Sequence, residues 1–318
     1  MLSAPLSAPG RIHNDCSCRC HRSALRNIGK AVTDQRKICR RVVQPSGSGL
    51  VNFQKQQKPT IKVGVVDATK HYSTRTGVIH ALEGVSFDVR EGELVCVLGP
   101  SGCGKTTLLW SMAGLHSLTR GQVLIDGEAV TQPHPQVAMM FQEANLLPWR
   151  NLIRNIYLPF EIKRLKPSDY RDRINGLLKR VGLAGFEHKF PRELSGGMQQ
   201  RASIVRSLAV DPSIMLMDEP FGALDAFTRD EMNLLIQQIW MDTGKTIVFI
   251  THNIAEAIFL ADRIVVLSPR PGRLSRIFPI DFERPRSIDL VTQPHFIDLL
   301  VEIKKSIDHS GGGASVVD

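Results

Sequence analysis

Long apolar runs and aromatic residues are both scarce in this sequence of 318 residues. No stretch offers the roughly 18 uncharged apolar residues that a membrane span needs, and runs such as TIVFITH at 246–252 have the length of a strand. We therefore expect that the chain itself does not cross a bilayer. Aromatic residues make up only 6% of the sequence, which argues against a broad adhesive surface.

Cysteines are few outside the N-terminal region. Of the six, only Cys96, in an apolar run, and Cys103, in a glycine-rich stretch, lie in the remainder of the chain. This distribution excludes a disulfide framework and favours a reducing compartment. The N-terminal cysteines are also candidate metal ligands, but Cys16, Cys18 and Cys20 are separated by single residues. They therefore lack the spacing of about two to four residues that a zinc knuckle needs. The candidate ligands are Cys16, Cys18, Cys20 and His21.

Acidic residues are nearly absent from the first 60 positions. This region holds eleven lysines and arginines but only Asp15 and Asp34, whereas the rest of the chain has 29 basic and 29 acidic residues. The net charge of +9 therefore belongs to the N-terminal region, and no DNA-binding face is needed to explain it. Without apolar periodicity, residues 1–60 are predicted to be a disordered basic extension. Three interpretations stay open: a misannotated start, a targeting or regulatory segment, or the metal site.

Short apolar runs separated by glycine begin at Ile61 and predict strands, the early ones joined by short turns. The spacing is helical between about 150 and 210, and strands then alternate with helices. Such alternation predicts parallel strands with crossover helices. We expect the main domain to span 61–280, with a helical part at about 150–210. A C-terminal tail, 281–318, then follows a candidate hairpin at 272–280.

The stretch LGPSGCGKTTLL at 98–109 matches the pattern GxxxxGK(S/T), after an apolar strand and before a helical pattern. Glycines let the backbone curl so that successive N–H groups face phosphate oxygens, and the helix N-terminus adds its positive end. Lys105 is expected to reach the outer phosphates and Thr106 to hold Mg²⁺, and we hypothesise that Cys103 is sensitive to alkylation. An ordinary turn is the alternative. The predicted phosphate-binding residues are Gly99, Pro100, Ser101, Gly102, Cys103, Gly104, Lys105, Thr106 and Thr107.

Two carboxylates end the apolar run SIMLMDEP at 213–220. Ligands collect at the carboxyl edge of parallel strands, so Asp218 is placed to hold Mg²⁺ through water and Glu219 to polarise an attacking water. The alternative is that both residues cap the following helix.

The stretch ELSGGMQQR at 193–201 places Ser195, Gly196 and Gly197 just before a helical pattern. This arrangement predicts a second helix start that holds an anion, although an ordinary serine cap also explains it. One nucleotide does not need two such sites in one chain.

Taken in order, these motifs resemble those of the ATPase subunit of ABC transporters, from 61 to about 279. The resemblance implies that 99–106 is the Walker A loop, 214–218 the Walker B strand, 194–199 the signature and 223–225 the D-loop. In the signature, Met198 stands where many relatives have glutamine. The resemblance further implies catalytic roles for Glu219, the switch histidine His252 and the Q-loop residue Gln142, which also helps to hold Mg²⁺. Tyr72 resembles the aromatic residue that stacks on adenine, though a strand-edge tyrosine is the alternative.

The fold implied by the resemblance is an α/β P-loop NTPase (RecA-like) core with an antiparallel β subdomain and an α-helical signature subdomain. The implied cofactors are ATP and Mg²⁺. Two copies are expected to form a head-to-tail homodimer with each ATP between the P-loop of one and the signature of the other. The implied partners are an integral membrane permease and a periplasmic solute-binding protein, with no nucleic acid. The implied location is peripheral, on the cytoplasmic face of the inner membrane.

Three further stretches, at 144–151, 218–230 and 268–273 (SPRPGR), resemble the nitrate, sulfonate and taurine importer group. The chain is thus expected to hydrolyse ATP and energise a bacterial importer of a small anion, with the permease docking near 143–155. The plain interpretation of LLPWR at 146–150 is a loop with a buried tryptophan. A soluble ABC-type ATPase acting on nucleic acid or ribosomes is an alternative, but it usually has heptad arms or two cassettes. A P-loop kinase would leave Ser195 and His252 without a role.

Overall fold

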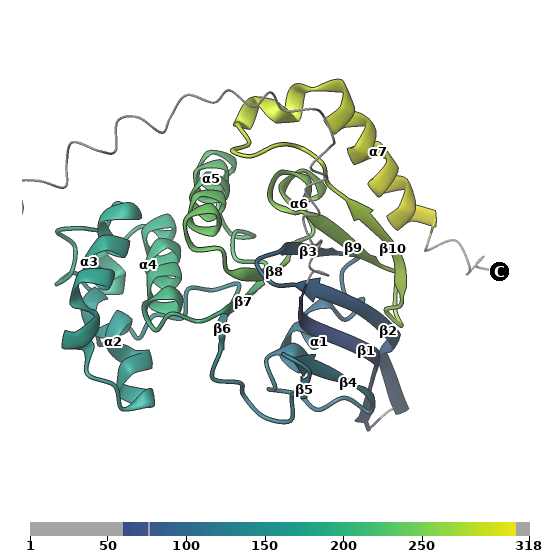
Figure 1. Cartoon of the computed structure of the whole chain (residues 1–318), viewed down its shortest axis with the longest axis horizontal. Coiled ribbons are helices and arrows are strands. Elements are labelled where there is room, and N and C mark those ends of the chain that lie inside the picture. The colour runs from purple at the N-terminus through teal and green to yellow at the C-terminus, as the bar shows by residue number, and fades with distance from the viewer. Residues whose placement is uncertain (1–59, 76, 310–318) are drawn as a thin grey trace, which may run out of the picture. The chain divides into compact units, whose positions relative to one another are not determined.

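The computed structural model describes residues 60–75 and 77–309, all of which belong to one compact unit (Figure 1). The predictions for the N-terminal extension, including the candidate ligands Cys16, Cys18, Cys20 and His21, lie outside the described residues.

A six-stranded sheet forms the centre of the fold, in the order β10-β9-β3-β8-β7-β6. All of its pairs are parallel except β10 with β9. The segment 272–280, predicted as a hairpin, instead supplies one strand that folds back on β9 and buries Phe278. The strands are β3 (Leu94–Leu98), β6 (Val137–Met140), β7 (Ile214–Asp218), β8 (Thr246–Ile250), β9 (Arg263–Leu267) and β10 (Leu274–Pro279).

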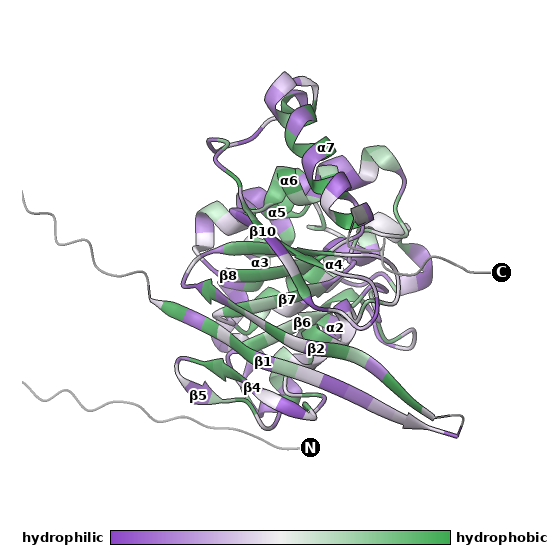
Figure 2. Ribbon diagram, turned by 90° about the vertical axis from the view of Figure 1, so that its right-hand side faces the viewer, coloured by the Kyte–Doolittle hydropathy of each residue, from purple (hydrophilic) through white to green (hydrophobic). Residues whose placement is uncertain are grey.

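Both faces of this sheet are buried, because successive side chains of a strand point to opposite sides. In β3, Leu94, Cys96 and Leu98 pack in one apolar core, called the first core below. Val95 and Val97 pack in the other, the second core. The first face is covered by α5 (Ala226–Thr243), α6 (Ile254–Leu260) and α7 (Pro294–His309), and α1 (Lys105–Met112) lies on the second (Figure 1). The central strands are accordingly hydrophobic along their length (Figure 2).

A separate antiparallel sheet, in the order β2-β1-β4-β5, covers α1 and confirms the predicted antiparallel β part. Val63 and Val65 of β1 alternate inward, and they share the second core with Leu108 and Met112 of α1. The strands are β1 (Ile61–Thr74), β2 (Gly77–Arg90), β4 (Arg120–Ile125) and β5 (Glu128–Ala129).

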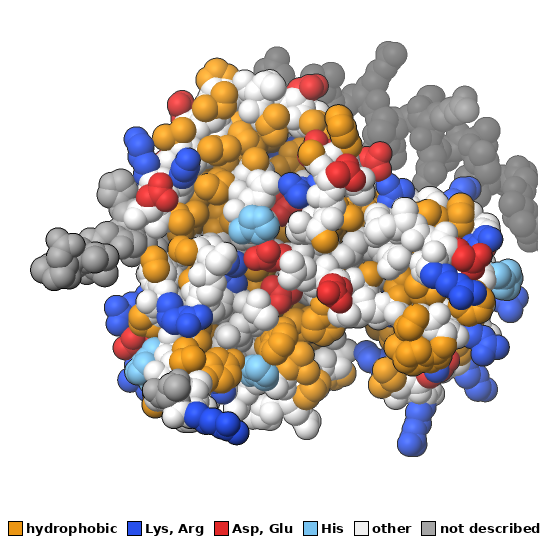
Figure 3. Space-filling view, turned by 180° about the vertical axis from the view of Figure 1, so that it is seen from behind, with side chains coloured by type: hydrophobic (Ala, Val, Ile, Leu, Met, Phe, Trp, Pro, Cys, Tyr) orange, Lys and Arg blue, Asp and Glu red, His pale blue; other side chains and the backbone are white. Residues whose placement is uncertain are grey.

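Three helices form a lobe beside the central sheet (Figure 1): α2 (Leu152–Lys163), α3 (Arg171–Arg180) and α4 (Gly196–Ala209). Asn151 caps α2, and the buried Asn155 bonds the backbone of Leu147 and Arg150, which pins the preceding loop. Hydrophobic side chains gather on the outer surface of this lobe among lysines and arginines (Figure 3). Two 3₁₀ turns precede α3 and α4, at Pro167–Tyr170 and Pro191–Glu193.

The segment predicted as a C-terminal tail contains a helix, α7, and a 3₁₀ turn. Phe296 and Ile303, seven residues apart on α7, are buried in the first core, a spacing that places both on one face of the helix. Within the described residues, none of the helices is both long and apolar enough to span a bilayer. The remaining helical segments are α5 (Ala226–Thr243), α6 (Ile254–Leu260), the 3₁₀ turn Ile288–Thr292 and α7 (Pro294–His309).

Arg286 fastens this C-terminal region to α6. Its guanidinium is buried and donates hydrogen bonds to the carbonyl oxygens of Ile258, Phe259 and Ala261, where α6 ends. These carbonyls have no partner within the helix, so the arginine supplies the donors that they need. Burial lowers the pKa of Arg286 to about 10, which leaves it charged at neutral pH.

Replacing Arg286 by Met should lower the free energy of unfolding by about 2 to 4 kcal/mol, because buried carbonyls lose charge-assisted donors. Urea unfolding followed by circular dichroism measures the change. The control is Arg120→Met, which removes an exposed ion pair: the side chain of Arg120 is 67% exposed and that of its partner Asp67 is 47% exposed. This substitution should lower the free energy of unfolding by less than about 1 kcal/mol. Equal stability of the two variants would contradict the anchoring role.

Candidate functional site

The site lies where three parallel strands end. The P-loop follows β3, Asp218 and Glu219 lie at the end of β7, and His252 follows β8. Because β3, β8 and β7 are parallel neighbours, their carboxyl ends meet at one edge of the sheet.

The P-loop needs glycine at two positions. Gly102 and Gly104 have φ angles of 77° and 97°, in the left-handed region that side chains rarely adopt. A β-carbon at Gly104 would also lie 2.7 Å from the carbonyl oxygen of Ala81. The chain can therefore turn from β3 into α1 within six residues, which leaves the N-terminus of α1 facing the loop.

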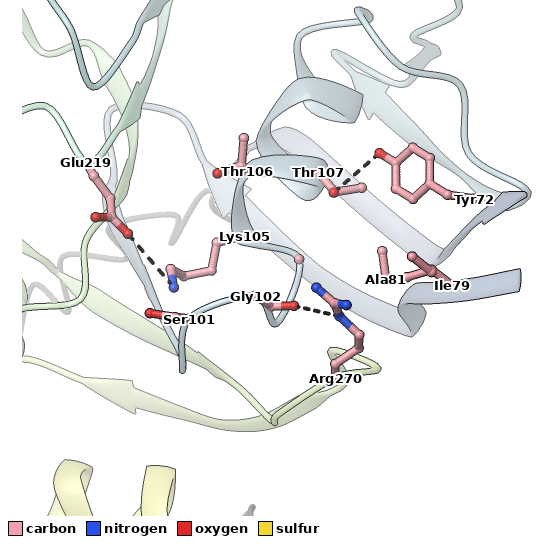
Figure 4. A pocket seen from close by; sticks show the side chains of 11 residues that line it. Tyr72, Ile79, Ala81, Ser101, Gly102, Lys105, Thr106, Thr107, Glu219 and Arg270 are labelled. Atoms are coloured by element: carbon pink, nitrogen blue, oxygen red, sulfur yellow. Dashed lines mark hydrogen bonds and ion pairs between the residues drawn. The ribbon is translucent and has the colours of Figure 1, made fainter. Parts of the chain in front are cut away.

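Lys105 is folded back onto this loop (Figure 4). Its side chain is buried, and Nζ donates hydrogen bonds to the carbonyl oxygens of Gly99 at 2.8 Å and Pro100 at 3.1 Å. Nζ also lies 4.0 Å from Oε1 of Glu219. The ammonium is thus held at the sheet edge, between the loop and a carboxylate.

A cavity of about 490 Å³ lies over the P-loop. Tyr72 lines it from β1, with its hydroxyl 3.4 Å from Thr107 Oγ1 and 3.1 Å from His116 Nδ1. Of the predicted residues, those that line it are Tyr72, Ser101, Gly102, Gly104, Lys105, Thr106, Thr107 and Glu219. Three further lining residues, Ile79, Ala81 and Arg270, were not predicted.

Three predicted P-loop residues do not line the cavity. Gly99 and Pro100 contribute the carbonyl groups that hold Lys105. Cys103 points into the second core with no exposed surface, and burial raises the pKa of its thiol. Because the thiolate is the reactive form, this environment opposes the hypothesis that Cys103 is readily alkylated.

Glu219 lies near the other two predicted catalytic residues, His252 and Gln142. Its Oε2 lies 2.9 Å from Nδ1 of His252. A β-carbon at Gly222 would lie 3.6 Å from Nε2 of Gln142 and 3.8 Å from Glu219 Oε2, so these two side chains approach the same point. Glu219 itself has a φ of 43°, a strained conformation of the kind found at functional sites.

Asp218 and Thr106 fit a magnesium ion. Asp218 is 8% exposed, and it accepts a hydrogen bond of 3.2 Å from the Thr106 hydroxyl. Burial raises the pKa of Asp218, and the neighbouring Glu219 adds to the shift, so a bound cation would relieve the cost of this buried charge. Magnesium is typically held by one or two carboxylates together with substrate phosphates. No group of three or more His, Cys, Asp or Glu side chains suited to a metal occurs among residues 60–75 and 77–309.

The signature residues lie apart from this cavity. The exposed Ser195 caps α4, its hydroxyl accepting from the backbone N–H of Met198 at 3.3 Å. Within one chain the structure does not bring Ser195, Gly196 or Gly197 into the lining of the P-loop cavity. Gln142 and Gly196 instead line a second cavity, of about 550 Å³, between the sheet edge and the helical lobe.

Glu256 is a buried residue of this region that the motifs did not indicate. It is 5% exposed, the hydroxyl of Thr251 hydrogen-bonds its carboxyl group, and burial raises its pKa. Its Oε1 has no hydrogen-bond partner within the described part of the chain. In the sequence, Asn253 is followed three residues later by Glu256, a pattern typical of an ordinary helix N-terminus. The sequence therefore gives no signal that the carboxyl group of Glu256 is buried.

Comparison with known proteins agrees with this geometry. The family model described as ABC transporter matches residues 82–222. The chain is 45% identical over 251 residues to the taurine import ATP-binding protein of Rhizobium johnstonii, covering 76% of this chain and 95% of that one. It is 39% identical over 249 residues to the aliphatic sulfonates import ATP-binding protein of Bacillus thuringiensis, covering 78% and 97%.

A solved structure has the same fold. It is the dimeric, post-hydrolysis state of an ATP-binding cassette bound to ADP and Pi, with 32% identity and a TM-score of 0.61 over 70% of this chain and all of that one. Together with the sequence relatives, it confirms the resemblance and the α/β P-loop fold that the motifs implied. The chain belongs to the ATP-binding proteins of ABC transporters.

Proposed function

We propose that this protein hydrolyses ATP to drive an ABC importer, with the reaction centred on Glu219. The observation that carries the proposal is the convergence of Lys105, Glu219 and His252 at one end of the P-loop cavity. A bound ATP would place its triphosphate over the backbone N–H groups of the loop and its base beside Tyr72.

The charged residues divide the work of phosphoryl transfer. Lys105 donates hydrogen bonds to the carbonyl oxygens of Gly99 and Pro100 in the free protein. When ATP binds, its ammonium group donates to the outer phosphates instead, because charged oxygens are stronger acceptors. Asp218 and Thr106, with Gln142, would hold a Mg²⁺ ion, which would supply positive charge to offset that of the phosphates. Glu219 polarises the attacking water, and the hydrogen bond to His252 orients its carboxylate.

In this proposal, two copies of the chain complete each nucleotide site. Ser195 is exposed and outside the P-loop cavity of its own chain, which supports an arrangement in which a facing copy supplies this helix start to the nucleotide. The related cassette bound to ADP and Pi is itself dimeric, which supports this arrangement. Each ATP then joins two chains, and its cleavage releases them.

The partners follow from the relatives and from one exposed surface. Trp149 is 71% exposed, contrary to the interpretation of LLPWR as a loop with a buried tryptophan. It lies on the loop between the second cavity and α2, and we propose that a membrane permease docks there, at the cytoplasmic face of the membrane. A periplasmic solute-binding protein would deliver the solute, for which taurine or another sulfonate is favoured over nitrate by the relatives' names.

The alternative of a soluble ATPase that acts on nucleic acid or ribosomes is not favoured. The relatives described above are importer subunits, and beyond residue 60 the sequence has equal numbers of acidic and basic residues.

Replacing Glu219 by Gln should slow ATP hydrolysis by about 10² to 10⁴, because the amide cannot accept a proton from water. ATP binding should persist, and dimers should accumulate with ATP. Phosphate release and light scattering measure the two effects. The control Glu128→Gln alters an exposed residue of β5 and should leave turnover unchanged. A Glu219→Gln enzyme with wild-type turnover would refute the assigned role.

Replacing Trp149 by Ala should release the permease while ATP hydrolysis by the isolated subunit is retained. The measurement is affinity purification from detergent-solubilised membranes, followed by identification of a protein with many membrane spans. The matched control is Ile297→Ala, which alters an exposed apolar residue of α7. Recovery of DNA or ribosomes in place of a permease would overturn the transport proposal.

A further inference from the structure

We propose that Arg270, from the loop between β9 and β10, is a nucleotide-binding residue that contacts the phosphate nearest the base. This inference rests on the proposed function, since it concerns the same cavity. The loop, 268–273, has the sequence SPRPGR, one of the stretches that resemble the nitrate, sulfonate and taurine importer group.

The loop 268–273 packs against the P-loop and β2. The Gly272 N–H donates to the carbonyl oxygen of Ala81 at 3.0 Å, and the Glu83 N–H donates to the Gly272 carbonyl at 2.9 Å. A β-carbon at Gly272 would lie only 2.0 Å from the carbonyl oxygen of Cys103. The absence of a side chain at Gly272 therefore lets the loop reach both β2 and the P-loop.

Internal hydrogen bonds fix the shape of the loop. The Ser268 hydroxyl donates to the carbonyl oxygen of Pro271 at 3.2 Å and accepts from the N–H of Arg273 at 3.0 Å. The backbone that presents Arg270 is thus held in place before any ligand arrives, which lowers the entropic cost of a contact.

Arg270 projects from this support to the outer side of the P-loop turn (Figure 4). Its Nε donates to the carbonyl oxygen of Gly102 at 3.0 Å, and the guanidinium lines the cavity with Ile79 and Ala81. That bond uses one of the five N–H donors of an arginine. Among residues 60–75 and 77–309, no carboxylate forms a salt bridge with Arg270.

The position of Arg270 indicates which phosphate it contacts. Lys105 and Glu219 mark the end of the cavity where the γ-phosphate is cleaved, whereas Tyr72, Ile79 and Ala81 mark the end where the base lies. Arg270 lies on the latter side of Gly102 (Figure 4). A guanidinium there offers parallel donors that match phosphate oxygens, at a point that ATP and ADP share.

Arg273 provides a matched control within the same loop. It is also an arginine, but it forms a salt bridge of 2.8 Å with Glu83 and does not line the cavity. A general effect of loop charge would appear in both variants, whereas a phosphate contact would appear only at Arg270.

The experiment measures the Kd of Mg-ATP, Mg-ADP and Mg-GTP by calorimetry for the wild type, Arg270→Ala, Arg273→Ala and Lys105→Ala. Arg270→Ala should weaken all three nucleotides by about tenfold, the value of one charge-assisted hydrogen bond in a partly hydrated site. The loss should shrink as salt is raised, because the contact is ionic. Arg273→Ala should stay within about twofold of the wild type. Thermal unfolding confirms that each variant is folded.

The outcomes separate this inference from the proposed function. If Arg270→Ala binds like Arg273→Ala while Lys105→Ala loses affinity, the inference fails and the nucleotide site stands. If only ATP is weakened, or only the adenine nucleotides, the contact is with the γ-phosphate or the base, and the assignment is wrong. If Lys105→Ala also binds nucleotide normally, the proposed function itself fails.

Discussion

The parallel pairing of β3, β8 and β7 is the constraint on which the candidate site depends. Parallel strands bring their carboxyl ends to one edge, so segments separated by more than 100 residues in the chain, such as Lys105 and Glu219, meet there. The sheet is buried on both faces, and the surrounding helices therefore fix its geometry. The Glu219 backbone strain persists because Ile250 of β8 accepts its N–H at 3.0 Å, within this rigid frame.

Much of this arrangement was predictable, because it depends on local patterns. Apolar runs of strand length ending in Gly99, Asp218 and His252 indicated both the strands and the edge where they end. The P-loop was predictable because glycines at this spacing, directly between a strand and a helix, are typical of a loop that binds phosphate. The helical lobe followed from the apolar spacing of 152–209, and Asn151 and Ser195 begin two of its helices as capping residues.

The residues that were missed depend on contacts between distant segments. Arg270 reaches the cavity because Gly272 fits against Cys103, and nothing in SPRPGR alone reveals that neighbour. Glu256 is buried by the packing of α6, whereas its sequence context is that of an ordinary helix start. The helix α7 was overlooked because its buried positions, Phe296 and Ile303, lie in a short segment with many charged residues. The exposure of Trp149 is likewise a property of the folded loop, whose backbone Asn155 hydrogen-bonds at Leu147 and Arg150.

The helix α6 lies between the turn that carries His252 and the buried contacts of Arg286. This helix begins two residues after His252 and has only seven residues, so roughly 10 Å separates the reactive edge from the carbonyl groups that Arg286 holds. Arg286 and His252 therefore lie at opposite ends of one short helix. A change in the position of α6 would therefore shift both the turn that carries His252 and the buried contacts of Arg286, although Arg286 does not line the P-loop cavity.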